Sequence, residues 1–331
     1  MKYNRFEKYK VLFYRDKLEA VARGEMCLPV TWVVYPTYVC NYNCPHCIMR
    51  VERAPKDMLP NETLEKVVAD VIRLKDIESV IFSGGGEPLL HPKTMETIGK
   101  LHDAGIKTGL NTNGSMLRDA SKIDYLRVSV DAATRETYQH IHGVDKFDVV
   151  TENLLRVSDH KLELGLAFLV GPKNWAEIYQ FCEWAQQFRY DFIHIRPAWL
   201  DADYLSGGEE LMHIMPSVLK IKDEVEKDFR DVYFRVDKFD GYWTHRHYDK
   251  CRSTPLIAVL CADGQFSVCQ DNFIKFGDYN RQTFEECWFS EEHMEAIEKI
   301  DISKCPRCVE VGYNEIIQNC VMCDSLKRKL L

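Results

Sequence analysis

Three cysteines lie within eight residues near the start of the chain, in the segment Cys-Asn-Tyr-Asn-Cys-Pro-His-Cys that spans residues 40–47. Thiolates are soft ligands that suit both zinc and iron–sulfur clusters. A structural zinc ion takes four protein ligands, so here it would need a distant fourth residue such as His91. A four-iron cluster held by three cysteines instead keeps one iron open to a small molecule. Spacing alone leaves both interpretations open.

A second group of cysteines lies near the other end of the chain. Eight of the 13 cysteines fall between residues 251 and 323, and the odd total does not suit a disulfide framework. The N-terminal segment lacks the apolar core of a signal peptide, and no apolar run reaches the about 18 residues of a membrane span. We therefore expect a cytoplasmic protein whose reduced thiols serve metal or redox chemistry.

The composition is that of an ordinary globular protein. Of the 331 residues, 46% are hydrophobic and 28% are charged, which suits one large domain or two modest ones. The net charge of −8 argues against a protein that wraps nucleic acid, so we expect neither a nucleic-acid nor a membrane partner.

Strands and helices alternate along the first two thirds of the sequence, which predicts parallel strands joined by crossover helices. Six units suit an open, partial (β/α)6 barrel in an α/β fold, with ligands at the carboxyl ends of the strands. After Pro197 the alternation is expected to stop. The predicted strands are 30–35, 79–83, 107–111, 125–130, 164–170 and 192–195; the predicted helices are 5–23, 61–75, 94–104, 135–140, 147–160, 176–188 and 209–230. The expected organisation is a helical extension (1–28), a barrel (29–236) and a small Cys-rich α+β domain (237–331).

Two loop motifs at these strand ends resemble the radical S-adenosylmethionine (SAM) superfamily. They are the Cys-x3-Cys-x2-Cys segment after the first strand and Gly-Gly-Gly-Glu-Pro at 84–88 after the second. The resemblance implies that Cys40, Cys44 and Cys47 hold a [4Fe–4S] cluster whose open iron binds the amino and carboxylate groups of SAM. An electron donor such as flavodoxin or ferredoxin would reduce the cluster, and SAM cleavage would give a 5′-deoxyadenosyl radical. The paired motifs favour the cluster over zinc.

The same resemblance implies a set of SAM-binding residues. His46 matches the position that packs on adenine, and the next strands supply positions that contact the ribose or the methionine. One departure is His142, which stands where the family often has an arginine that pairs with the SAM carboxylate. A histidine there predicts that SAM binding weakens above its pKa. The implied set is His46, Gly84, Gly85, Gly86, Glu87, Asn113, Ser129, Asp131 and His142.

The C-terminal cysteines resemble the auxiliary-cluster domains called SPASM and its shorter form, twitch. The matching pattern is Cys-x12-Gly-x4-Cys from 251 to 269, followed by Cys-x2-Cys at 305–308. Full SPASM domains continue with two more cysteines, but those positions are Asn314 and Gln318 here. We therefore expect one auxiliary [4Fe–4S] cluster on Cys251, Cys269, Cys305 and Cys308. A second cluster, drawing on Cys261, Cys320 and Cys323, stays open.

Two further residues are candidates for catalysis. Cys261 could be a cluster ligand, a core residue, or a thiol that returns a hydrogen atom to a substrate radical. Arg196 ends the sixth strand, where it could orient an anionic or hydroxylated substrate or form a salt bridge. The lone Cys27, Cys182 and Cys287 are expected to be core residues.

The functional hypothesis is radical C–H chemistry, giving oxidation or epimerisation of a polar small molecule (a sugar, an aminocyclitol or a nucleoside). Only about 30 residues precede the predicted barrel, which leaves no room there for an added peptide-binding domain. A maturase or epimerase of a ribosomally made peptide is the second hypothesis. A non-catalytic iron–sulfur scaffold is the third, although a scaffold would not need the 84–88 loop.

Overall fold

One ten-stranded sheet runs through the computed structural model, which describes residues 8–47, 49, 57–198, 207–235, 246–305, 308 and 310–322. Its strand order is β10-β9-β8-β1-β2-β3-β4-β5-β6-β7. From β8 to β7 in this order, each strand runs parallel to the next one. The strands are β1 (Thr31–Val34), β2 (Ser79–Phe82), β3 (Lys107–Thr112), β4 (Tyr125–Ser129), β5 (Glu163–Val170), β6 (Phe192–Pro197), β7 (Val232–Phe234), β8 (Ile257–Leu260), β9 (Phe266–Ser267) and β10 (Lys275–Phe276).

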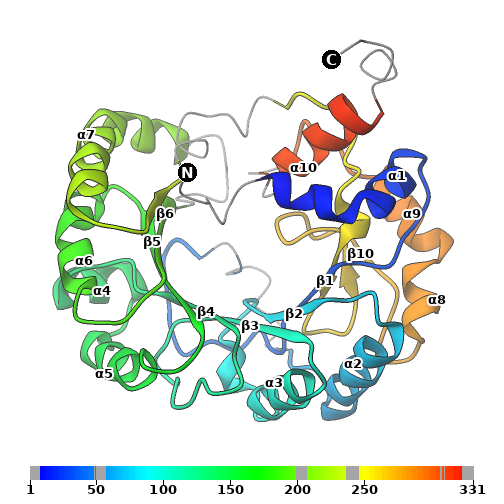
Figure 1. Ribbon diagram of the computed structural model, residues 1–331, viewed down its shortest axis with the longest axis horizontal. Helices are drawn as coiled ribbons and strands as arrows, with labels where there is room; N and C mark the ends of the chain where they lie inside the picture. Colours follow the sequence, from blue (N-terminus) through cyan, green and yellow to red (C-terminus); the bar gives the residue numbers. More distant parts are fainter. Residues whose placement is uncertain are drawn as a thin grey trace.

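The sheet curves into an open ring with helices along its outer side (Figure 1). The α-helices are α1 (Arg15–Ala22), α2 (Asn61–Leu74), α3 (Thr94–Asp103), α4 (Arg135–His142), α5 (Phe147–Val157), α6 (Ile178–Ala185), α7 (Gly207–Asp228), α8 (Phe284–Trp288), α9 (Glu291–Glu298) and α10 (Val311–Ile316). The α/β class and the open barrel expected from the sequence are confirmed. In the described part of the chain, no helix is long and apolar enough to cross a membrane.

Alternating residues of each strand divide the sheet into two faces. The outer face belongs to the main hydrophobic core, to which β4 contributes Leu126 and Val128. Trp32 of β1 is fully buried on this side and packs against Phe266 and Phe284 of the C-terminal region. The intervening strand positions face the concave inner side of the ring.

The alternation continues beyond Pro197, contrary to the sequence expectation. Helix α7 leads into β7, which pairs in parallel with β6. Strand β8 then pairs in parallel with β1, with Val34 opposite Leu260. Because β7 spans three residues and β8 four, neither strand is long enough to show a clear alternation of apolar and polar residues in the sequence. The sheet thus crosses the boundary expected near 236, although residues 236–245 lie outside the described part.

Helix α2 joins the barrel to the C-terminal region through buried polar contacts. Lys66 Nζ donates to the carbonyl of Tyr279 at 2.8 Å and to that of Gln282. The Tyr279 hydroxyl donates to Asp70 Oδ2 at 2.7 Å. These contacts fix the C-terminal region relative to β1 and β2. Lys66 and Asp70 are held by α2, and the residues they contact lie between β10 and α8.

The Tyr279–Asp70 hydrogen bond predicts a measurable loss of stability on its removal. Tyr279→Phe keeps the ring but leaves a buried carboxylate oxygen without its donor, which costs about 1–2 kcal/mol. Urea unfolding under anaerobic conditions measures the loss. Tyr179→Phe is the matched control, because its 2.9 Å hydrogen bond to Asp228 is exposed to solvent. Equal losses in the two variants would contradict the role given to the α2 contact.

Candidate active site

The first cysteine loop leaves the carboxyl end of β1. Cys40, Cys44 and Cys47 are half-buried in it, and a turn closes its end, with Cys47 N donating to the carbonyl of Cys44 at 3.3 Å. Three thiols on one short loop are the donor set that a four-iron cluster requires. Within the part of the chain that the structure describes, no three Cys, His, Asp or Glu side chains gather as they would around a single metal ion.

His91 does not complete a zinc site with these thiols. Its Nε2 donates to the carbonyl of Leu59 at 2.8 Å, and its Nδ1 accepts from the backbone N–H of Lys93 at 3.1 Å. Both ring nitrogens are therefore used, and the side chain is 2% exposed. The zinc alternative loses the fourth ligand that the sequence offered for it.

The glycine loop after β2 packs directly against the cysteine loop. Gly86 N donates to the carbonyl of Thr37 at 2.8 Å, and Glu87 N donates to that of Val39 at 2.9 Å. A Cβ atom on Gly86 would lie 2.0 Å from the Val39 carbonyl oxygen, and one on Gly85 would lie 2.2 Å from the Tyr38 ring. These two glycines are needed for the approach of the loops to each other. Gly84 has no such close neighbour.

Glu87 turns its carboxylate inward and holds the end of β3. It is 2% exposed and accepts from Thr112 Oγ1 at 2.7 Å, from Asn113 N at 2.8 Å and from Leu89 N at 3.1 Å. Burial raises the pKa of Glu87 above its usual range, against the lowering effect of these donors. Asn113 in turn donates to Asn41 Oδ1 at 2.9 Å, so the carboxylate links β2, β3 and the cysteine loop.

Asp131 lies just beyond β4 in a left-handed conformation, with φ of 60°, which Asp tolerates better than most residues. It is 1% exposed, and its Oδ1 accepts from Leu169 N at 2.7 Å. Burial is the main cause that raises its pKa to about 7, although the Leu169 N–H and the charges of Arg196 and Arg127 oppose the rise. Ser129, the last residue of β4, is half-buried opposite Ala167 of β5.

His142 ends α4 beneath the cysteine loop rather than on an open surface. Its Nε2 donates to the carbonyl of Val130 at 2.9 Å, and its Nδ1 lies 3.4 Å from Cys44 Sγ. Burial lowers its pKa to about 4, so the ring is neutral at neutral pH. These contacts do not support the charged partner for a carboxylate that the sequence suggested. They give His142 a place in bracing the loop, together with the 3.1 Å hydrogen bond from Asn43 N to its carbonyl.

His46 and Arg196 are the remaining candidates on the barrel side. His46 is half-buried between two of the cysteines, and burial lowers its pKa to about 4, which suits a neutral ring that packs on an aromatic ligand. Arg196 is a half-buried residue of β6, and its positive charge acts to lower the pKa of Asp131. The sequence-predicted residues of β4 and β6 are therefore brought together at one edge of the sheet.

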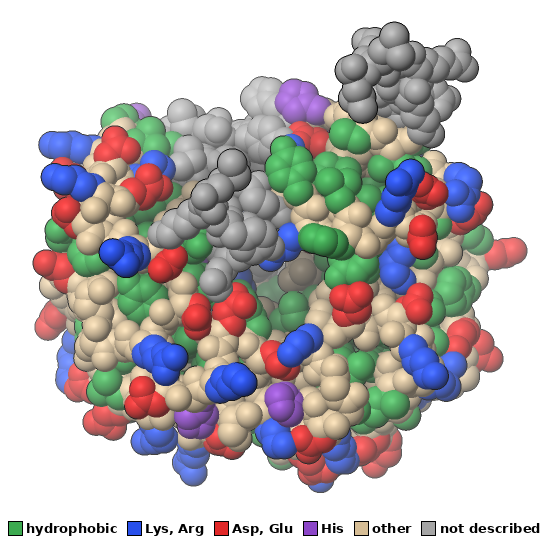
Figure 2. Space-filling view, viewed as in Figure 1, with side chains coloured by type: hydrophobic (Ala, Val, Ile, Leu, Met, Phe, Trp, Pro, Cys, Tyr) green, Lys and Arg blue, Asp and Glu red, His purple; other side chains and the backbone are tan. Residues whose placement is uncertain are grey.

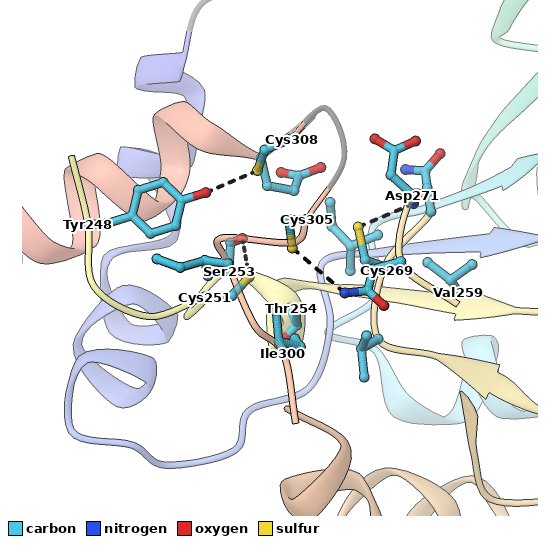
Figure 3. Close-up of a pocket in the computed structure, with 16 residues that line it drawn as sticks. Tyr248, Cys251, Ser253, Thr254, Val259, Cys269, Asp271, Ile300, Cys305 and Cys308 are labelled. Atoms are coloured by element: carbon cyan, nitrogen blue, oxygen red, sulfur yellow. Dashed lines mark hydrogen bonds between the residues drawn. The ribbon is translucent and has the colours of Figure 1, made fainter. Parts of the chain in front are cut away.

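The C-terminal cysteines line a cavity of about 580 Å³, a volume that includes solvent at its mouth (Figure 3). The four that the sequence grouped all lie on its wall: Cys251, Cys269, Cys305 and Cys308. Burial raises the pKa of all four thiols, that of Cys308 to about 12. The thiols therefore stay protonated until a metal centre displaces the protons.

Each of these sulfurs receives its own hydrogen bond. Backbone N–H of Asp271 donates to Cys269 Sγ at 3.4 Å, and the Tyr248 hydroxyl donates to Cys308 Sγ at 3.3 Å. The side-chain amides of Asn272 and Asn314 donate to Cys305 Sγ at 3.7 Å and to Cys251 Sγ at 3.6 Å. Such donors stabilise negative sulfur, so the cavity fits thiolate ligands of an iron–sulfur cluster. Sequence reasoning missed these donors, because nothing in their spacing marks them.

The other cysteines fall outside this cavity. Cys261 is fully buried in a small core with Val33, Tyr35 and Tyr38 on the inner side of β1 and β8. Cys320 is exposed, and Cys323 lies outside the described residues. Cys182 and Cys287 are fully buried, as predicted, whereas Cys27 is half-buried. A role for Cys261 as a hydrogen donor stays a prediction, and its burial favours the core interpretation.

Comparisons with known proteins agree with this geometry. The family model described as the radical SAM superfamily matches residues 34–185. A protein of Saccharolobus solfataricus named "Probable GTP 3′,8-cyclase" is 30% identical over 275 residues, which cover 76% of this chain and 88% of the relative. Its namesake in Saccharolobus islandicus is 29% identical over the same length, with the same coverage of both chains.

Two solved structures have a similar fold. SuiB of Streptococcus suis bound to its precursor peptide SuiA has a TM-score of 0.66 at 13% identity, covering 94% of this chain and 77% of that one. The anSMEcpe structure with AdoMet and the Cp18Cys peptide has a TM-score of 0.60 at 18% identity, covering 86% of this chain and 88% of that one. At such identities the likeness concerns the fold alone.

The chain belongs to the radical SAM superfamily. It is therefore a radical SAM enzyme, whose cofactors are a [4Fe–4S] cluster and S-adenosylmethionine.

The contact of Gly86 with the Val39 carbonyl predicts that Gly86→Ala removes the first cluster. The added methyl group must displace the backbone of the cysteine loop, because a carbonyl cannot rotate away as a side chain can. Iron analysis after anaerobic reconstitution should show a loss of about four iron atoms per chain. Gly84→Ala, whose nearest neighbour lies 3.6 Å away, should keep its iron. Full iron content in Gly86→Ala would show that the loops tolerate separation.

The raised pKa of Asp131 predicts a pH-dependent stability. Because its folded pKa of about 7 exceeds the usual Asp pKa of 3.8, the folded protein holds a proton that the unfolded chain has released. This contribution is complete below about pH 4 and is lost as the pH rises through 7. Asp131→Asn should remove it, since Asn accepts the Leu169 hydrogen bond and tolerates positive φ.

Urea unfolding without SAM, at several pH values between about 5 and 7.5, checks this expectation. Wild type should lose stability more steeply than Asp131→Asn, by up to about 1.4 kcal/mol per pH unit. Parallel pH profiles for the two proteins would show that Asp131 ionises in its usual range.

Proposed function

We propose that this enzyme removes a hydrogen atom from a polar small molecule in the class of sugars, aminocyclitols and nucleosides, bound inside the barrel. Cys40, Cys44 and Cys47 hold the cluster in this proposal, and His46, Asn113, Ser129 and Asp131 line the SAM site around it. When bound to the reduced cluster, SAM supplies a carbon radical that takes hydrogen from an unactivated C–H bond. Oxidation or epimerisation of the substrate follows.

The polar inner face of the barrel carries this proposal. On β4 and β6 the outward residues are apolar, whereas the inward residues Arg127 and Arg196 are cationic and half-buried. Asn111 on β3 and His194 on β6 add further hydrogen-bonding groups, and Asn111 Nδ2 donates to Ser83 at 3.0 Å. Figure 2 shows a hollow near the middle of the face on which these strands end. A polar interior with two guanidinium groups suits a hydroxylated or anionic ligand better than an apolar one.

The relatives sharpen the substrate class. Proteins named "Probable GTP 3′,8-cyclase" match most of this chain, which makes a purine nucleotide the first molecule to test. The likeness to the peptide-bound SuiB structure is a likeness of fold, so it does not favour a peptide.

The C-terminal cavity takes an auxiliary [4Fe–4S] cluster in this proposal, in the manner of a twitch domain. Its support is the placement of Cys251, Cys269, Cys305 and Cys308 on one wall, each with a hydrogen-bond donor. When bound, such a cluster supplies an electron acceptor near the substrate. The cavity lies beyond β8, which is the neighbour of β1 in the sheet, and its wall includes Ile257 and Val259 of β8.

Cysteine variants separate the two sites. Anaerobic reconstitution with SAM and dithionite should give 5′-deoxyadenosine with wild type, but at least about 100-fold less with Cys40→Ala, because its cluster lacks one of three ligands. Cys269→Ala should still cleave SAM but lose product formation from substrate. Cys182→Ala, in the core of α6, is the matched control and should keep both activities. Absence of 5′-deoxyadenosine from wild type would leave only the scaffold hypothesis.

GTP with a deuterated ribose tests the substrate class. Transfer of deuterium into 5′-deoxyadenosine would place GTP or a close analogue at the site. If GTP gives no transfer, a panel of deuterated sugars and aminocyclitols follows. Transfer from a peptide alone would overturn the small-molecule proposal and support the maturase hypothesis.

A further inference from the structure

We infer that Tyr248, Asn272 and Asn314 set the reduction potential of the auxiliary cluster by donating hydrogen bonds to its cysteine sulfurs. This inference rests on the auxiliary cluster proposed above. The three side chains act through the ligands and touch neither substrate nor SAM, so they are positioning residues. The fourth donor is the backbone N–H of Asp271, which no substitution short of proline removes.

The donors come from three separate parts of the chain and converge on one cavity. Tyr248 precedes the first ligand, Asn272 follows β9, and Asn314 lies on α10. Their bonds reach three different sulfurs, those of Cys308, Cys305 and Cys251 respectively. Figure 3 shows the bond from Tyr248 to Cys308. With Asp271 N on Cys269, every sulfur has a donor of its own. Ser253 Oγ also lies 3.9 Å from Cys251 Sγ. A donor on each of the four sulfurs indicates a site built to hold negative sulfur.

Asn314 is fixed in the orientation that this role requires. Its Oδ1 accepts from Arg252 N at 2.6 Å and from Ser253 N at 3.0 Å. Because both partners are donors, the side-chain amide cannot flip. Its Nδ2 therefore faces both Ser253 Oγ at 2.9 Å and Cys251 Sγ at 3.6 Å. The residue is 1% exposed, so water does not compete for the amide. Full SPASM patterns have a cluster-binding cysteine at this position. Here the position carries an amide, which donates a hydrogen bond to the ligand Cys251.

Tyr248 offers the cleanest single contact. It is 6% exposed, so its hydroxyl lies in the cavity wall beside Cys308. A protonated hydroxyl at 3.3 Å from sulfur can only serve as the donor to a thiolate. Tyr248→Phe would remove this one hydrogen bond and keep the ring.

Hydrogen bonds to the sulfurs favour the reduced state of a cluster. Reduction adds an electron, and the added negative charge spreads onto the sulfur ligands. A donor to sulfur therefore binds more strongly after reduction than before it, which raises the potential. The cavity removes water from the thiolates, and without the donors that desolvation would make the cluster harder to reduce. The donors thus make the cluster a better acceptor for an electron left on a substrate.

The test is a redox titration of the reconstituted full-length protein, followed by electron paramagnetic resonance. Tyr248→Phe and Asn314→Leu are compared with wild type. Gln318→Leu is the matched control: Gln318 Oε1 accepts from Asp249 N and Arg252 Nη1, so it ties the same segment without reaching a sulfur. The first cluster serves as an internal reference in every sample.

We expect the midpoint potential of the auxiliary cluster to become more negative in both donor variants. It should not change in Gln318→Leu, and the first cluster should keep its potential in all of them. An unchanged auxiliary potential in Tyr248→Phe, with full iron content, overturns the inference but not the proposal of an auxiliary cluster. Tyr248→Phe alone decides the inference if Asn314→Leu fails to load iron. A wild-type protein that binds only one four-iron cluster overturns both proposals together.

Discussion

The parallel pairing of β8 with β1 is the constraint on which the rest of the site depends. With Val34 opposite Leu260, the two strands end together, and the chain leaves each of them toward a different set of cysteines. The hydrogen bond from Tyr35 N to the carbonyl of Leu260 extends the pairing to the first residue after β1. Parallel strands place their carboxyl ends at one edge, where the first cysteine loop follows β1. Strand β9 turns back along β8 and brings Cys269 toward the amino end of β8, where Cys251 also lies on the cavity wall. Without this pairing, the C-terminal region would be an appended domain.

Burial explains much of the electrostatics around the first loop. Glu87, Asp131 and His142 are each at most 2% exposed, and for each of them burial acts against the charged form. Their hydrogen bonds run to backbone groups and to neighbouring side chains, where they fix loop geometry. Glu87 and His142 are thus mainly part of the support of the cysteine loop, and the guanidinium charges that can meet a ligand lie on the strands β4 and β6 themselves.

The sequence predicted the parts of this structure that have a local signal. The cysteine spacings, the glycine loop and the strands from β1 to β6 are readable because each is a contiguous pattern of residue types. The continuation through β7 and β8 could not be predicted, since strands of three and four residues carry almost no period. The role of His142 was also out of reach, because the sequence does not show how deeply a side chain is buried. Tyr248, Asn272 and Asn314 escaped for a similar reason: they approach the sulfurs from segments remote from one another.

The two cysteine sites also differ in how they come into being. The first is a run of eight residues, whose three thiols are neighbours in any conformation of the chain, folded or not. The second takes its ligands from positions 251 to 308, and only a finished fold brings them to one cavity. The proposed auxiliary site is therefore complete only in the folded chain, whereas the first cysteine motif is contiguous in the sequence.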